Sequence, residues 1–153
     1  MEDSSMHTPI SQSKLNLAII LIRMMLAFVF ISEGIQKFLF PDALGVGRFI
    51  KIGIPLPSIM APFVGGVEIV FGVLLLLGWF TRMAAFPLIM SMLVAFASTK
   101  IPMLLEKGFW TFAHEARVDW CMLVGLTFLV IVGGGEWSIE YVTSIRRKDS
   151  KIP

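Results

Sequence analysis

The feature that most constrains this chain is a single carboxylate, Glu68, inside the apolar run VGGVEIVFGVLLLLGWFTR of residues 64–82. An ionisable group at such a depth in a bilayer costs on the order of 3 kcal/mol on insertion scales. A chain that keeps this group therefore needs a partner for it on another helix. We expect a helical membrane protein with a buried polar centre.

The composition supports a membrane environment, since 56% of the residues are hydrophobic and only 16% are charged, against about 25% charged in soluble domains. Four apolar blocks predict an all-α fold, a polytopic membrane four-helix bundle with spans near 15–40, 56–80, 83–101 and 115–132. The protein should be a multi-pass integral protein, in the cytoplasmic (inner) membrane if it is bacterial. A net charge of +2 gives no indication of nucleic acid binding.

The segments outside these spans divide the chain into a flexible polar N-terminal tail (1–14), a membrane domain (15–141) and a basic C-terminal tail (142–153). Residues 41–57, rich in proline and glycine, predict a short interfacial segment between helices 1 and 2. Ile101-Pro102 predicts the end of the third span, and residues 103–113 a loop.

Basic residues near the span ends are about equally numerous on the two sides, so the orientation is predicted from their placement and not from their number. Four spans place both termini on one side of the membrane. Arg82 lies in a short turn between spans, and the basic residues of the C-terminal tail are Arg146, Arg147, Lys148 and Lys151. We therefore expect both termini in the cytoplasm, with the tail near anionic lipid.

The first helix carries a stripe of residues within an arc of about 80°, namely Arg23, Ala27, Phe30, Gly34 and Lys37, with Glu33 beside it. Arg23 lies roughly 12 Å below the start of the apolar run, too deep to reach the interface easily. We hypothesise that Arg23 or Lys37 pairs with Glu68, with Asp119 as a further partner. The candidate polar cluster is thus Arg23, Glu33, Lys37, Glu68 and Asp119. Two alternatives stay open: the pair only fixes helix register, and Glu33 with Lys37 forms an ordinary i,i+4 pair.

Small residues predict the helix contacts: Ala27 and Gly34 on the first helix, and Gly65, Gly66 and Gly72 around Glu68. The methionines of the third span, Met83, Met90 and Met92, are expected to be core or lipid-facing filler. His114, Glu115 and Asp119 at the mouth of the fourth helix are expected to be a solvated collar, with no metal.

Several short motifs recur in an order that resembles the DoxX family of small four-helix integral membrane proteins. They are Ser32-Glu33-Gly34 in the first span, the loop Gly53-Ile54-Pro55-Leu56-Pro57, then Gly72, Gly78 and Arg82, and finally Gly135 and Ser138. The likeness covers roughly residues 15–141. Glu140 stands where the family usually has Asp.

The resemblance implies a function in membrane redox chemistry, because the family is named from a subunit of a thiosulfate:quinone oxidoreductase. The protein would then be the membrane subunit of an oxidoreductase complex, with the polar cluster lining a pocket for a quinone-like or other amphipathic molecule. The expected partners are the lipid bilayer and a soluble or membrane redox protein, and homo-oligomerisation stays open.

Because Cys121 is the single cysteine, disulfide chemistry would need a partner's thiols. Two other functions stay open: a non-catalytic scaffold or assembly factor, and a proton or small-ion transporter. The motifs indicate no catalytic residue.

Overall fold

The computed structural model describes residues 11–149, which form six helices joined by short connections. Residues 1–10 of the expected N-terminal tail and residues 150–153 of the C-terminal tail lie outside this range. The helices are α1 (Gln12–Leu39), α2 (Val46–Lys51), α3 (Pro57–Leu77), α4 (Thr81–Lys107), α5 (Phe109–Val132) and α6 (Ile139–Asp149).

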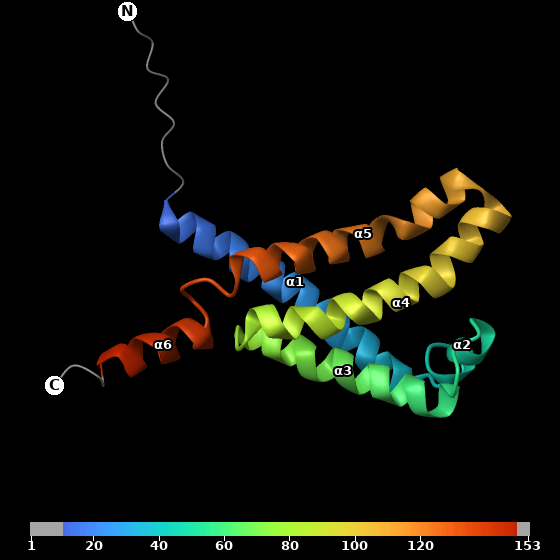
Figure 1. Ribbon diagram of the computed structural model, residues 1–153, viewed down its shortest axis with the longest axis horizontal. Helices are drawn as coiled ribbons and strands as arrows, with labels where there is room; N and C mark the ends of the chain where they lie inside the picture. Colours follow the sequence, from blue (N-terminus) through green and yellow to red (C-terminus); the bar gives the residue numbers. More distant parts are fainter. Residues whose placement is uncertain (1–10, 150–153) are drawn as a thin grey trace, which may run out of the picture.

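The four long helices α1, α3, α4 and α5 run alternately in opposite directions (Figure 1). As a result, α1 begins at the same end of the molecule at which α5 ends, and α6 leaves from that end. The short helix α2 lies at the opposite end, beside the start of α3. It occupies the segment for which the sequence predicts an interfacial element.

Three of these helices, α1, α3 and α4, are long and apolar enough to cross a membrane. Among the described helices, α5 is not one of these candidate spans, and its first half carries Glu115, Arg117 and Asp119. The all-helical fold and three candidate spans therefore agree with the sequence. The fourth span of the predicted bundle would have to be α5.

The prediction of a loop over residues 103–113 is wrong. Helix α4 continues through Pro102 to Lys107, and α5 begins at Phe109. Pro102 removes one backbone hydrogen bond, a loss that membrane helices tolerate. The chain reverses instead at Gly108, whose φ of 79° lies in a region that glycine occupies without strain.

Glycines allow α1 and α3 to pack closely. A Cβ atom added to Gly34 would lie 2.7 Å from the carbonyl oxygen of Gly65, and one added to Gly72 would lie 2.9 Å from the side chain of Ile31. This confirms the predicted contact face for these three glycines. At Gly66, by contrast, no atom of the described residues lies within 4 Å of such a Cβ, so its assignment to the face is wrong.

The packed apolar core lies in one half of the bundle. Its fully buried members come from the middle of α1, the end of α3, the start of α4 and the second half of α5, and include Leu26, Phe30, Leu75, Leu88 and Leu126. The buried stripe Arg23, Ala27, Phe30 and Gly34 confirms that this face of α1 points inward. In the other half, toward α2, the helices leave a cavity.

Candidate functional site

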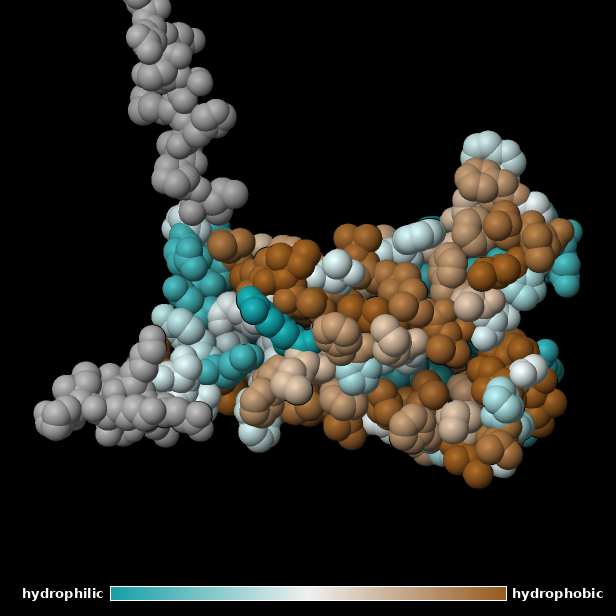
Figure 2. All heavy atoms as spheres, in the orientation of Figure 1, coloured by the Kyte–Doolittle hydropathy of each residue, from teal (hydrophilic) through white to brown (hydrophobic). Residues whose placement is uncertain are grey.

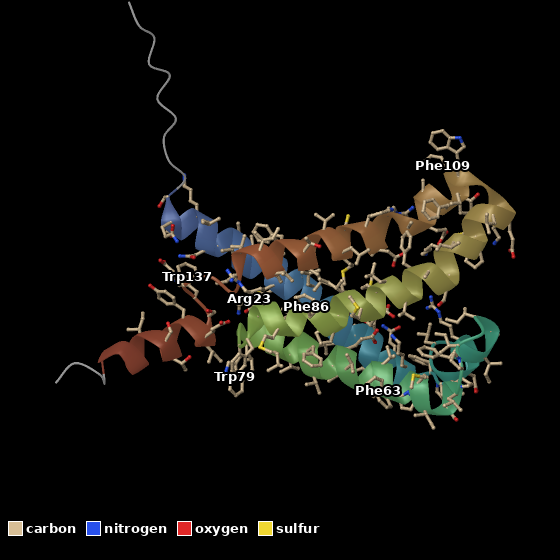
Figure 3. All side chains as sticks on the ribbon, in the orientation of Figure 1. Arg23, Phe63, Trp79, Phe86, Phe109 and Trp137 are labelled. Atoms are coloured by element: carbon tan, nitrogen blue, oxygen red, sulfur yellow. The ribbon has the colours of Figure 1, made fainter. Side chains whose placement is uncertain are left out.

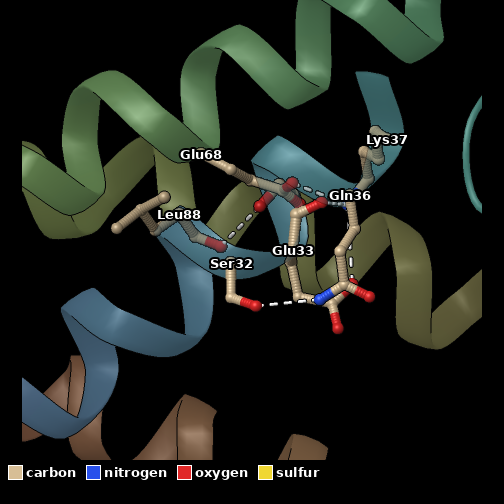
Figure 4. A network of polar contacts seen from close by, with 7 residues as sticks. Ser32, Glu33, Gln36, Lys37, Glu68 and Leu88 are labelled. Atoms are coloured by element: carbon tan, nitrogen blue, oxygen red, sulfur yellow. Dashed lines mark hydrogen bonds and ion pairs between the residues drawn. The ribbon is translucent and has the colours of Figure 1, made fainter. Parts of the chain in front are cut away.

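Lys37 on α1 forms an ion pair with Glu68 on α3, and its Nζ lies 2.6 Å from Glu68 Oε2 (Figure 4). Both side chains are nearly buried, 11% and 9% exposed. Glu33, 3.8 Å from the same ammonium, is about half exposed. Of the two cations that the sequence offered to Glu68, the structure brings Lys37 to it.

A second ion pair joins the other two long helices. Lys100 Nζ on α4 lies 3.3 Å from Asp119 Oδ2 on α5, and it donates a hydrogen bond to the carbonyl oxygen of Glu115 at 2.9 Å. Asp119 therefore has its own lysine and does not share the Lys37–Glu68 pair. Sequence reasoning missed Lys100 because it lies next to Ile101-Pro102, where the helix was expected to end.

A cavity of about 610 Å³ lies between these two ion pairs, and Lys37, Glu68 and Asp119 line it. Its walls come from α1, α3, α4 and α5, and α2 contributes Phe49 at the outer end. The space-filling view is hollowed at this end of the molecule, between the α4–α5 turn and α2 (Figure 2). Cavities of this size hold small organic ligands.

The rest of the lining is mostly apolar, and part of it was missed from the sequence. Met90 and Met92 of α4 line the cavity together with Met60 and Met122. Met92 also packs against the apolar core and Met90 is exposed, in agreement with their interpretation as core or lipid-facing residues. Methionine side chains are flexible and adapt to ligands of varied shape. Within the described residues, no group of three His, Cys, Asp or Glu side chains is placed to hold a metal ion.

Arg23 lies away from this cavity, near the opposite end of the bundle (Figure 3). Its guanidinium donates to four backbone carbonyls: Leu75 at 3.0 Å, Leu76 at 2.9 Å, Gly134 at 2.8 Å and Trp137 at 3.3 Å. Leu75 and Leu76 belong to the last turn of α3, where carbonyls lack helical partners and a positive charge is favourable. The structure thus separates Arg23 from Glu68.

Several motif residues lie at the same end of the bundle as Arg23. A Cβ at Gly78, which ends α3 with a φ of 66°, would lie 2.5 Å from the guanidinium. Ser138 donates to the Gly135 carbonyl at 2.6 Å. Glu140 accepts a hydrogen bond from the Thr81 amide at 3.3 Å, at the start of α4. These residues fasten the chain after α5 to the ends of α3 and α4.

The remaining motif residues shape connections. Gly53, with a φ of 73°, turns the chain after α2, and Pro55 follows it. Pro57 starts α3 at a position where proline is favourable. Arg82 donates to the carbonyl of Ile131 at 3.1 Å and so links α4 to the end of α5.

Comparison with known proteins supports the resemblance to the DoxX family. The DoxX family model matches residues 18–101. The chain is also 49% identical over 129 residues to the "Uncharacterized membrane protein Rv3486" of Mycobacterium tuberculosis, a match that covers 80% of this chain and 79% of the relative. No solved structure matches the chain.

Proposed function

Because the chain belongs to the DoxX family of membrane proteins, we propose that it is the membrane subunit of an oxidoreductase complex and binds a quinone-like or other amphipathic small molecule in its cavity. The observation that carries the proposal is the cavity itself, which joins a charged wall to an apolar interior. A polar head group would lie near Lys37 and Glu68, and an apolar tail would lie against the methionines.

The position of the cavity supports a ligand that arrives through the bilayer. It lies among helices that have the length and composition of membrane spans. We propose that α5, which packs along α4, is the fourth span and completes its wall. The charges of α5 would then be tolerated because Asp119 pairs with Lys100.

The first test is to purify the protein in mild detergent, extract bound small molecules and identify them by mass spectrometry. Ala95 lines the cavity, whereas Ala97, on the same helix, does not. Ala95→Trp should fill the cavity and remove the bound molecule, and Ala97→Trp should retain it. Ordinary bilayer lipid alone in all three preparations would contradict the proposal.

A second candidate function is a scaffold without chemistry of its own. One observation favours it: α6 lies beyond the candidate spans and exposes an apolar stripe of Ile139, Val142 and Ile145. In that case the double variant Lys37→Met, Glu68→Gln, which removes the charged pair of the cavity without leaving one charge unpaired, should leave the capture of partner proteins unchanged. Affinity purification of wild type and variant side by side measures this.

A further inference from the structure

The inner wall of the cavity carries unused hydrogen-bond acceptors. Lys37 contacts only one carboxylate oxygen of Glu68, and Oε1 accepts no hydrogen bond from residues 11–149. On the opposite wall, Asp119 Oδ2 is buried and likewise accepts none from the described chain, although Lys100 lies 3.3 Å away. A buried acceptor without a donor is unfavourable, so Asp119 Oδ2 is ready to receive a donor from a ligand. Glu68 Oε1, which Lys37 leaves free, offers a second acceptor.

The hydroxyl groups of the wall add further acceptors. Ser91 donates its proton to the carbonyl oxygen of Leu88 at 3.0 Å, and Thr99 donates to that of Ala95 at 2.7 Å. Both residues line the cavity. Because each proton is already used within α4, the oxygen atoms offer lone pairs to a ligand.

The donors of the wall are already occupied or lie at the rim. Lys37 Nζ is held by Glu68 at 2.6 Å and by the carbonyl oxygen of Glu33 at 3.4 Å. Arg48, on α2, is exposed at the outer end of the cavity, where water can satisfy its guanidinium. The carboxylates of Glu68 and Asp119 each have a lysine counter-ion, so the wall favours a neutral ligand.

We infer that the cavity selects a neutral amphipathic molecule whose polar end carries hydroxyl donors, and that it binds a quinol more tightly than the corresponding quinone. This inference rests on the proposed function and specifies the chemistry of its ligand. A quinol carries two hydroxyl donors, whereas the quinone presents two carbonyl acceptors to a wall that is already rich in acceptors.

The test compares decyl-benzoquinone with its quinol, prepared anaerobically with dithionite, on the full-length protein in detergent. Binding raises the thermal unfolding midpoint with the logarithm of the ratio of ligand concentration to Kd, so a concentration series gives each Kd, and dithionite alone gives the baseline. We expect at least a tenfold lower Kd for the quinol, because each hydrogen bond to a charged acceptor contributes about that factor. Equal or tighter quinone binding would overturn this inference alone, whereas no binding of either probe would also overturn the proposed function.

A matched pair of variants tests whether the acceptors of the cavity wall cause the preference for the quinol. Thr99→Val removes one acceptor of the wall with little change in shape and should weaken quinol binding severalfold, with no loss for the quinone. Thr127→Val is the control, because Thr127 makes the same internal hydrogen bond, to Leu123 at 2.8 Å, outside the cavity. An equal loss of quinol binding in both variants would overturn the assignment of Thr99 as an acceptor for the ligand.

Discussion

Arg23 and Lys37 lie on one face of α1, yet the structure stabilises their charges in different ways. Lys37 has a carboxylate partner, whereas Arg23, only 4% exposed, is surrounded by carbonyl dipoles. The planar guanidinium has five N–H donors directed outward, and the ammonium has three on a flexible stem. Only arginine can therefore bind the end of α3 and the segment after α5 at the same time.

The first prediction concerns Arg23. Arg23→Lys should lower the free energy of unfolding by about 3 kcal/mol or more, because a single ammonium cannot reach all four carbonyls and leaves buried acceptors without donors. Thermal unfolding in detergent measures the loss. The control is Arg117→Lys, since Arg117 is exposed and, among residues 11–149, bonds only the nearby His114 carbonyl. This variant should change stability by less than about 0.5 kcal/mol. Equal losses of stability in the two variants would contradict the role assigned to Arg23.

The second prediction concerns the buried pair. Glu68→Gln should destabilise the protein by about 3 kcal/mol, because it leaves the nearly buried Lys37 ammonium with only the half-exposed carboxylate of Glu33, 3.8 Å away. The double variant Lys37→Met, Glu68→Gln should recover a large part of that loss. Unfolding curves of the wild type, both single variants and the double variant form the cycle. If the two substitutions were simply additive, the pair would not be coupled.

At the scale of elements, the contact between α1 and α3 is the most extensive in the bundle. It depends on the absence of side chains at Gly34 and Gly65, where backbone atoms of the two helices approach each other. This contact holds Lys37 and Glu68 within reach of each other, since Gly34 and Gly65 each precede one member of the pair by three residues.

The third prediction compares two glycines. Gly34→Ala places a methyl group 2.7 Å from the Gly65 carbonyl oxygen, so it should separate the helices and destabilise the protein by about 2 kcal/mol. Gly66→Ala meets open space and should be neutral or stabilise by up to about 1 kcal/mol, because alanine is the better helix former. Thermal unfolding distinguishes them, and a loss in both variants would contradict the close contact.

The sequence predicts elements better than it predicts partners. Apolar blocks and glycine spacing correctly place the main helices and the α1–α3 face. Arg23 and Lys37, however, share a face while lying about 21 Å apart along the helix, so a helical-wheel argument cannot decide which of them meets Glu68. The α4–α5 turn was misplaced because Pro102 is only a weak helix breaker in a membrane, and the error concealed Lys100.

At the scale of the whole molecule, the two ends of the bundle differ. Arg23, Glu140 and Arg82 fasten helix ends together at one end, and the cavity occupies the other. Aromatic side chains lie exposed at both ends, among them Trp79 and Trp137 at one and Phe109 and Trp110 at the other (Figure 3). Such residues favour the two membrane interfaces.

The fourth prediction tests the number of spans. Lys14 near the start of α1 and Ser144 in α6 should lie on the same side of the membrane if α5 crosses it. In a Cys121→Ser background, Lys14→Cys and Ser144→Cys should both resist an impermeant maleimide applied to intact cells and react after the membrane is opened. Labelling of one site but not the other in intact cells would contradict four spans.

The ring of carbonyls around Arg23 also has a consequence for biosynthesis. Two of its acceptors, Gly134 and Trp137, lie 111 and 114 residues after Arg23 in the chain. At a synthesis rate of about 5–20 residues per second, this interval lasts on the order of 5–20 s. During that time α1 has left the ribosome while its guanidinium lacks its full set of acceptors. The first helix should therefore wait beside the insertion machinery, and a nascent chain cut short before Gly134 should be an early target for membrane proteases.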